Sequence, residues 1–343
     1  MERLEAKEIL LTAVGKGATD LYLAAGAPPV LRVDSRLVKM DAPLLSAGDT
    51  ERFARFLLSD EQWERFAGAG EIVAASSIPG VGRFRAAVYR QQGVCALSLR
   101  PIPDAVPSIE ELGLPEAVKN LALCSQGLIL VTGPTRSGKT TTLAAMVDLI
   151  NRGRSCLVIT LENPIEYLHR HQMSIVSQRE VGEDTPSFYC GLRSALAQGA
   201  DVIIAGELPD GEAVRAAISA AERGHLIIAG FPALDATQTV ERLIGNFPPD
   251  CRQQMMVRLA AVLQGVVSQR LFPRASGTGL VPAVEVLIAT PAVRSLIRDG
   301  ALRQLPSTIE AGGRYGMQTL AASLKRLCEE GIVPCSEALP QGR

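Results

Sequence analysis

An excess of charge of either sign is missing from this sequence, and aromatic residues are scarce. Its 343 residues include 35 Lys and Arg against 36 Asp and Glu, which leaves a formal net charge of -1. Aromatic residues make up only 4% of the chain, with a single tryptophan. Proteins that bind nucleic acid gather basic residues against the phosphates and often stack aromatic rings on the bases. The composition therefore disfavours a nucleic-acid partner.

Long apolar runs and paired cysteine motifs are also lacking. No stretch approaches the roughly 18 apolar residues of a membrane-spanning helix, and the charged, amphipathic N-terminus is unlike a secretory signal. The seven cysteines are scattered without a C-x-x-C pair, which favours reduced thiols and a cytoplasmic location. His169 and His171 could seat a metal on a strand, but no other Cys or His lies nearby in the sequence. We therefore do not favour a metal site at these histidines.

One glycine-rich stretch carries a specific chemical pattern. Residues 133–140 match G-x-x-x-x-G-K-[ST], the phosphate-binding loop. The apolar run Leu128–Thr132 before it is typical of a buried strand, and Thr141–Asn151 after it has apolar residues at helical spacing. Backbone N–H groups at a helix N-terminus offer partial positive charge to phosphate oxygens. The predicted nucleotide-binding residues are Gly133, Pro134, Thr135, Arg136, Ser137, Gly138, Lys139, Thr140 and Thr141.

The chemistry of this loop predicts ATP and Mg²⁺ as ligands. Lys139 is expected to reach the β- and γ-phosphates, and the Thr140 hydroxyl to complete the magnesium shell. Glu207 and Glu162 each follow an apolar strand, and the carboxyl ends of strands are where open α/β sheets bind ligands. We predict that Glu207 holds the magnesium or polarises water and that Glu162 is the general base. The alternative is that both are ordinary loop acids.

The pattern of elements predicts two domains. Residues 1–100 contain an amphipathic helix, short alternating strands and two further helices, which indicates a small α+β module with an antiparallel sheet. Proline-rich residues 101–107 open a predicted linker over residues 101–115, because proline suits neither a helix interior nor a central strand. Residues 116–343 alternate strand and helix patterns, which predicts an α/β domain with a largely parallel sheet, helices on both faces and a C-terminal helical cap.

Several further motifs make the chain resemble the retraction ATPases of type IV pili, a branch of the secretion-type ATPases. The resemblance runs from Ala18–Leu21 through the phosphate loop and the acidic box Leu161–Glu166. It continues through Gln178–Val181, Ala205–Glu207 and Ala292–Arg298, the last resembling a motif tied to retraction. It implies a PAS-like N-terminal domain, a RecA-like ATPase domain and a homohexameric ring that serves twitching motility. The implied partners are inner-membrane platform proteins of the pilus, which would hold the protein peripherally at the membrane, and a PilT-like paralogue.

The resemblance also implies further site residues. Arginines of the N-terminal domain would complete the nucleotide site, and Arg83 and Arg100 are the principal candidates, although alternating arginines are also typical of a solvated strand face. The family's histidine box retains only His225, which is therefore a candidate catalytic residue. Proline stands where its second histidine would be, at Pro232.

Other departures from the family pattern are Pro209, Asn163, Gln92 and Arg136. Two functions from different classes follow. The chain is a working motor ATPase, or it is a hydrolysis-impaired paralogue that binds nucleotide and regulates a ring. A nucleic-acid translocase of related fold is a third and less favoured interpretation, because the basic and aromatic surface it needs is missing.

Overall fold

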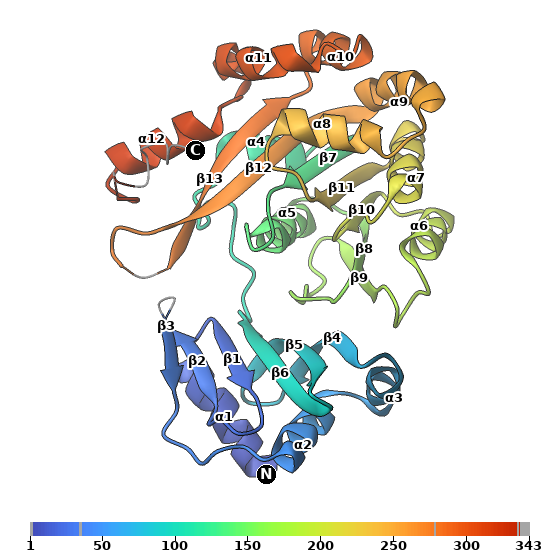
Figure 1. Ribbon diagram of the computed structural model, residues 1–343. Helices are drawn as coiled ribbons and strands as arrows, with labels where there is room; N and C mark the ends of the chain where they lie inside the picture. Colours follow the sequence, from blue (N-terminus) through green and yellow to red (C-terminus); the bar gives the residue numbers. More distant parts are fainter. Residues whose placement is uncertain (1–2, 34–35, 278, 335, 337–343) are drawn as a thin grey trace. The chain divides into compact units, whose positions relative to one another are not determined.

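The computed structural model describes residues 3–33, 36–277, 279–334 and 336, and these form two compact units (Figure 1). The first unit comprises Met1–Ala105 together with Pro164–Leu168. The second comprises Val106–Asn163 and His169–Arg343. The chain thus leaves the second unit after Asn163 and returns to it at His169. No sequence pattern predicts this excursion.

The first unit is built on a six-stranded antiparallel sheet with the order β3-β2-β1-β6-β5-β4. Helices α2 and α3 begin at capping boxes: the Ser46 and Ser59 side chains accept from the N3 backbone N–H, and the Asp49 and Gln62 side chains accept from the backbone N–H of these serines. Phe53, Phe66 and Phe84 are buried in its core. Its elements are α1 (Arg3–Gly15), β1 (Asp20–Leu23), β2 (Val30–Val33), β3 (Arg36–Lys39), α2 (Ala47–Leu57), α3 (Asp60–Ala69), β4 (Glu71–Ile78), β5 (Gly82–Gln91) and β6 (Val94–Ile102).

The antiparallel sheet predicted for this unit is confirmed, and β4, β5 and β6 pair side by side within it. Strand β3 is not predicted by the sequence, because all four of its residues are exposed and it lacks the apolar alternation of a half-buried strand. Gln92 lies in the turn between β5 and β6 at φ +52°, followed by Gly93 at φ +79°. Two-residue hairpin turns require this left-handed backbone, so Gln92 serves the hairpin.

The predicted linker over residues 101–115 divides between the two units. Strand β6 continues through Pro101 to Ile102, which is tolerated because β1 pairs with β6 only as far as Leu99. Ile109 and Leu114 are buried in the core of the second unit. The division between the units falls between Ala105 and Val106.

The second unit contains a seven-stranded sheet with the order β13-β12-β7-β11-β10-β8-β9. Neighbouring strands are parallel except for the antiparallel pair β12 and β13. Apolar residues of α4 and α5 cover one face, and those of α6 to α9 cover the other. The predicted, largely parallel sheet with helices on both faces is therefore confirmed. Its elements as far as α9 are α4 (Glu116–Ala122), β7 (Gly127–Thr132), α5 (Lys139–Gly153), β8 (Leu157–Glu162), β9 (Ile175–Glu180), α6 (Phe188–Ala197), β10 (Val202–Ala205), α7 (Gly211–Glu222), β11 (Leu226–Phe231), α8 (Ala236–Gly245) and α9 (Pro249–Val262).

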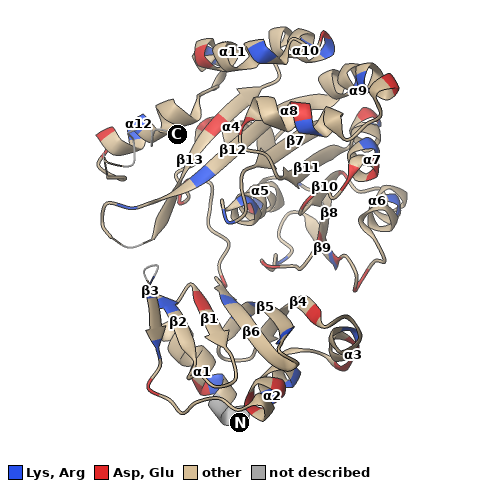
Figure 2. Ribbon diagram, in the orientation of Figure 1, with Lys and Arg blue, Asp and Glu red and all other residues tan. Residues whose placement is uncertain are grey.

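The C-terminal part of the described chain ends in helices, as expected, but the sequence does not predict two strands that precede them. Two long strands, β12 (Leu263–Pro273) and β13 (Leu280–Ile288), come before the last helices (Figure 1). Strand β12 follows α9 directly at Leu263, so the apolar residues of helix and strand run together in the sequence. The helices that follow are α10 (Pro291–Arg298), α11 (Leu305–Ala311) and α12 (Leu320–Glu329), with 3-10 turns at Leu302–Gln304 and Gly313–Tyr315. Basic and acidic residues are interspersed along the elements of both units (Figure 2).

Candidate active site

The glycine-rich loop connects the end of β7 to the start of α5, at the carboxyl edge of the parallel sheet. Gly133 has φ +151°, and a side chain there would overlap the Gln269 carbonyl oxygen and Ser137. Gly138 is the N-cap of α5 at φ +87°, and no side chain of the described residues caps this helix. The first turn of α5 therefore offers backbone N–H groups to an anion, which fits a phosphate group.

Lys139 lies over this loop. Its Nζ donates to the carbonyl oxygens of Gly133 at 2.8 Å and Pro134 at 3.0 Å. Burial lowers the pKa of Lys139, and the nearby charge of Glu207 opposes that shift. A bound phosphate would give this half-buried ammonium a partner of opposite charge in place of neutral carbonyl groups. The buried Ser137 Oγ, which has no hydrogen-bond partner among the described residues, leaves a further polar atom at the same loop.

Side chains of strand β12 form hydrogen bonds with the loop and with α5, which the sequence does not predict. The buried Gln269 accepts from Thr142 Oγ1 at 2.9 Å and donates through Nε2 to the Ser137 carbonyl at 2.7 Å. Beside it, Ser268 accepts from Thr132 Oγ1 at 2.8 Å. The sequence feature that could have pointed to this role is the polar pair Ser268 and Gln269 after an apolar run. Buried polar side chains need hydrogen-bond partners, so such a pair in a core strand indicates a specific contact.

Arg136 stands in the exposed part of the loop in a left-handed backbone conformation, at φ +66°. Pro134 and Thr135 are exposed beside it, while Thr140 and Thr141 are half-buried in the first turn of α5. A left-handed backbone costs a non-glycine residue about 1–2 kcal/mol. Arginine therefore occupies a position that glycine would adopt without this strain.

Glu162 is the last residue of β8, at the same edge of the sheet as the loop. Its Oε1 accepts hydrogen bonds from Thr160 Oγ1 at 2.7 Å and from Gln178 Nε2 at 3.2 Å. An ionised carboxylate has two acceptor oxygens, so these two bonds orient the group and are compatible with its taking up a proton. Position and chemistry suit a general base.

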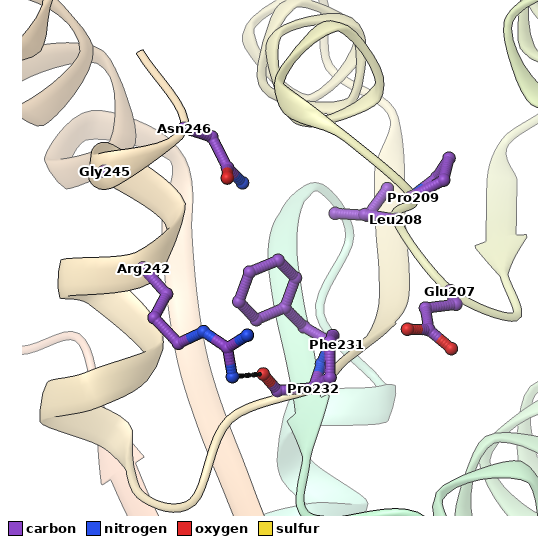
Figure 3. Close-up of a pocket in the computed structure, with 8 residues that line it drawn as sticks. All are labelled: Glu207, Leu208, Pro209, Phe231, Pro232, Arg242, Gly245 and Asn246. Atoms are coloured by element: carbon purple, nitrogen blue, oxygen red, sulfur yellow. Dashed lines mark hydrogen bonds between the residues drawn. The ribbon is translucent and has the colours of Figure 1, made fainter.

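Glu207 is exposed just beyond β10 and lines a pocket of about 320 Å³ (Figure 3). Its strand end is placed by close backbone contact. Leu208 N–H donates to the Gly230 carbonyl at 3.1 Å, and a side chain at Gly230 would overlap the Gly206 carbonyl oxygen. The charge of Glu207 acts on Lys139, so Glu207 lies in the same region as the phosphate-binding loop.

The unusual prolines line this same pocket. Pro232 follows β11 and Pro209 lies two residues after Glu207, and Figure 3 shows Phe231 and Pro232 between Arg242 on α8 and Glu207. Arg242 Nη1 donates to the Pro232 carbonyl oxygen. The departures from the family pattern at positions 209 and 232 thus alter the wall beside Glu207.

His225 lies at the end of β11 opposite the loop, and its role as a catalytic residue stays a prediction. It precedes β11, while Phe231 at the other end of that strand pairs with Thr132 beside the loop. Its Nδ1 lies 2.7 Å from the Ala200 carbonyl oxygen. A strand rises about 3.3 Å per residue, so the length of β11 separates His225 from the edge that carries the loop.

Arg83 and Arg100 are engaged within the first unit. Arg83 donates through Nε to the Glu166 carbonyl at 3.0 Å and through Nη2 to the Ile165 carbonyl at 2.6 Å. Arg100 Nη2 lies 2.9 Å from the buried carboxylate of Asp20. Their participation in a nucleotide site stays a prediction.

Comparisons with known proteins agree with this architecture. The family model described as Type II/IV secretion system protein matches residues 95–308. The type IV pilus retractation ATPase PilT of Pseudomonas aeruginosa is 39% identical over 330 residues, covering 96% of either chain. The type IV pilus ATPase PilU of the same organism is 38% identical, covering 98% of this chain and 88% of PilU. A crystal structure of the pilus retraction motor PilT with bound ADP has a TM-score of 0.87 at 42% identity, covering 97% of this chain and 95% of that one.

No helix in the part of the chain that the structure describes combines the length and apolar character of a membrane span.

Proposed function

This chain belongs to the Type II/IV secretion system protein family, in its branch of PilT-like ATPases, and we propose that it is an ATP-hydrolysing motor of type IV pilus retraction. The observation that carries this proposal is the phosphate-binding loop between β7 and α5, with Glu162 and Glu207 at the same sheet edge. Similarity to PilT over 96% of the chain supports the assignment to retraction.

Each residue of the site has a distinct proposed role. The loop N–H groups and Lys139 bind the phosphates of ATP, and Lys139 exchanges its present carbonyl partners for phosphate oxygens. Thr140 and Glu207 hold Mg²⁺, which neutralises phosphate charge when it is bound. Glu162 accepts the proton of the attacking water.

Assembly is part of the proposal. We infer a homohexameric ring in the cytoplasm, held peripherally at the inner membrane by platform proteins of the pilus. Arg83 and Arg100 complete the charge neutralisation at the nucleotide, which requires them to exchange some of their present partners within the first unit. Light scattering with and without ATP and Mg²⁺ tests the ring, and a protein that stays monomeric under both conditions would contradict it.

A second candidate function follows from the pocket wall beside Glu207. Pro232 has no N–H and no charge to offer a phosphate, and Pro209 lies close by in the same pocket. These two residues favour a paralogue that binds nucleotide, hydrolyses it slowly and regulates a ring.

Steady-state ATP hydrolysis by the full-length protein in the presence of Mg²⁺ decides between the two functions. A motor turns over ATP, and the Glu162→Gln variant loses turnover while it retains nucleotide binding. A regulator binds nucleotide with little turnover in either form. Absence of nucleotide binding would contradict both functions.

A further inference from the structure

Gln178, on strand β9, contacts both ends of the chain's excursion into the first unit. Its Nε2 donates to Glu162 Oε1 at 3.2 Å, and its Oε1 accepts from the backbone N–H of His169 at 2.8 Å. Glu162 lies just before the excursion, and His169 is the residue at which the chain returns. One carboxamide therefore joins the proposed general base to the far end of the segment.

The excursion itself is anchored firmly in the first unit. Ile165 and Tyr167 are buried, and Arg85 Nη1 pairs with Glu166 Oε1 at 2.8 Å. Arg83 adds hydrogen bonds to the backbone carbonyls of residues 165 and 166. The segment is joined covalently to the second unit through Asn163 and His169, which flank it.

We propose that Gln178 is a positioning residue that couples the orientation of the Glu162 carboxylate to the Pro164–Leu168 segment of the first unit. The inference rests on the proposed role of Glu162 in hydrolysis. Gln178 is suited to this because its carboxamide donates and accepts at once, so its orientation responds to both ends of the segment. Movement of His169 rotates or releases the group that holds Glu162.

Two variants separate the two contacts. Gln178→Met removes both the donor and the acceptor at nearly constant volume. Gln178→Glu keeps an acceptor for the His169 N–H but loses the donor to Glu162. Gln172→Met is the control, because Gln172 is an exposed glutamine on the returning segment whose side chain contacts Asp148 instead of Glu162.

We expect both Gln178 variants to lower kcat for ATP hydrolysis by about 10- to 100-fold with little change in ATP affinity, since misplacing a reacting group by about 1 Å can cost about 10²-fold. Gln172→Met keeps the wild-type rate. Wild-type kcat in Gln178→Met would overturn the proposal, as would a loss confined to KM.

Hydrogen–deuterium exchange without nucleotide provides an independent readout. The peptide that contains His169 exchanges faster in Gln178→Met and at the wild-type rate in Gln178→Glu, because only the former loses the acceptor. Unchanged exchange in Gln178→Met would overturn the contact on which the inference rests. The exchange measurement does not depend on ATP turnover. If the wild-type protein lacks ATPase activity, the proposed hydrolysis fails, and the exchange result still tests the contact between Gln178 and His169.

A double variant tests the coupling to the first unit. Arg85→Ala removes the ion pair that anchors Glu166. If the effect of this ion pair on Glu162 passes through Gln178, the double variant Arg85→Ala, Gln178→Met has the same kcat as Gln178→Met alone. Fully additive losses would overturn the coupling.

Discussion

Gln269 and Ser137 lie 132 residues apart in the sequence and are joined by a hydrogen bond of 2.7 Å between the Gln269 carboxamide and the Ser137 carbonyl. The same side chain accepts from Thr142 on α5. A strand from the C-terminal part of the chain thereby fixes both the phosphate-binding loop and the helix that follows it.

Replacing Gln269 by Leu tests this support. The change leaves the Thr142 hydroxyl and the Ser137 carbonyl without their partner, and each buried polar group left unpaired costs about 1–3 kcal/mol. We expect a lower unfolding free energy in denaturant titrations and weaker ATP binding. Gln198→Leu, at an exposed glutamine after α6, is the control and should change neither quantity. Unaltered nucleotide affinity in a folded Gln269→Leu protein would contradict the role assigned to β12.

Replacing Lys139 by Ala should abolish tight ATP binding while the fold is retained. The ammonium donates to loop carbonyls at the surface of the site, so its loss removes a ligand contact and little core packing. Binding of a fluorescent ATP analogue measures the first effect, and circular dichroism measures the second. Lys119→Ala removes a surface lysine paired with Glu110 and serves as the control. Equal nucleotide affinity in Lys139→Ala would remove the basis of the loop assignment.

Pro232 is expected to limit turnover more than binding. The loss of one preorganised donor at a developing charge costs about 10²–10³ in rate. The loop and Lys139 remain to bind ATP in the ground state. The combined Pro232→His and Pro209→Arg variant should hydrolyse ATP faster than the wild type at similar affinity, measured by steady-state kinetics and equilibrium binding. If the wild-type protein already matches PilT in turnover, the two prolines have no catalytic consequence.

Arg294 and Arg298, in the segment that resembles the retraction motif, should behave differently from each other. Arg294 Nη1 donates to the Ala260 and Ala261 carbonyls at the end of α9, at 2.6 and 2.8 Å, and burial lowers the pKa of Arg294. Arg294→Ala should therefore lower the unfolding free energy by about 1–2 kcal/mol, since it removes a C-terminal helix contact.

Arg298 is exposed, and its side chain contacts nearby exposed or half-buried residues of the same helix end, donating to Ser295 Oγ at 2.6 Å and lying 3.5 Å from the Asp299 carboxylate. Arg298→Ala should change stability by less than about 0.5 kcal/mol and leave ATPase activity intact while it impairs retraction. Thermal unfolding and a twitching assay measure the two effects. Loss of ATPase activity in Arg298→Ala would contradict the separation of motor chemistry from this helix.

Glu285 should make the second unit less stable as pH rises. Burial raises the pKa of Glu285, and the nearby charge of Asp235 raises it further. The hydrogen bond that Glu285 accepts from the Ala236 N–H acts in the opposite direction. A carboxyl whose pKa is higher in the folded state stabilises the fold below its unfolded pKa, and this contribution is lost as pH rises through the folded pKa. Glu285→Gln should therefore raise the unfolding free energy at neutral pH by up to about 1 kcal/mol.

Urea titrations at several pH values measure this effect, and Glu241→Gln, at an exposed position on α8, is the control. A variant whose stability varies with pH as steeply as that of the wild type would show that Glu285 is not the group responsible.

The sequence by itself determined the phosphate-binding loop, the acids at the strand ends and the alternation of strands and helices. These depend on local spacing, such as the apolar run that ends at Thr132 and the helical pattern that begins after Lys139. The PilT-like assignment also follows from sequence motifs alone, because they recur from Ala18–Leu21 to Ala292–Arg298. Local patterns were insufficient at α9 and β12, where helix and strand meet without a loop.

Only the tertiary structure decided which polar residues meet. It brought Gln269 into hydrogen bonds with the phosphate-binding loop, joined Gln178 to Glu162 and His169, and placed His225 at the end of β11 opposite the loop. The physical reason is that strand order and the direction of each strand determine which residues share a sheet edge. A motif records the chemistry of a residue, but the end of the strand on which that residue lies determines whether it can reach the ligand.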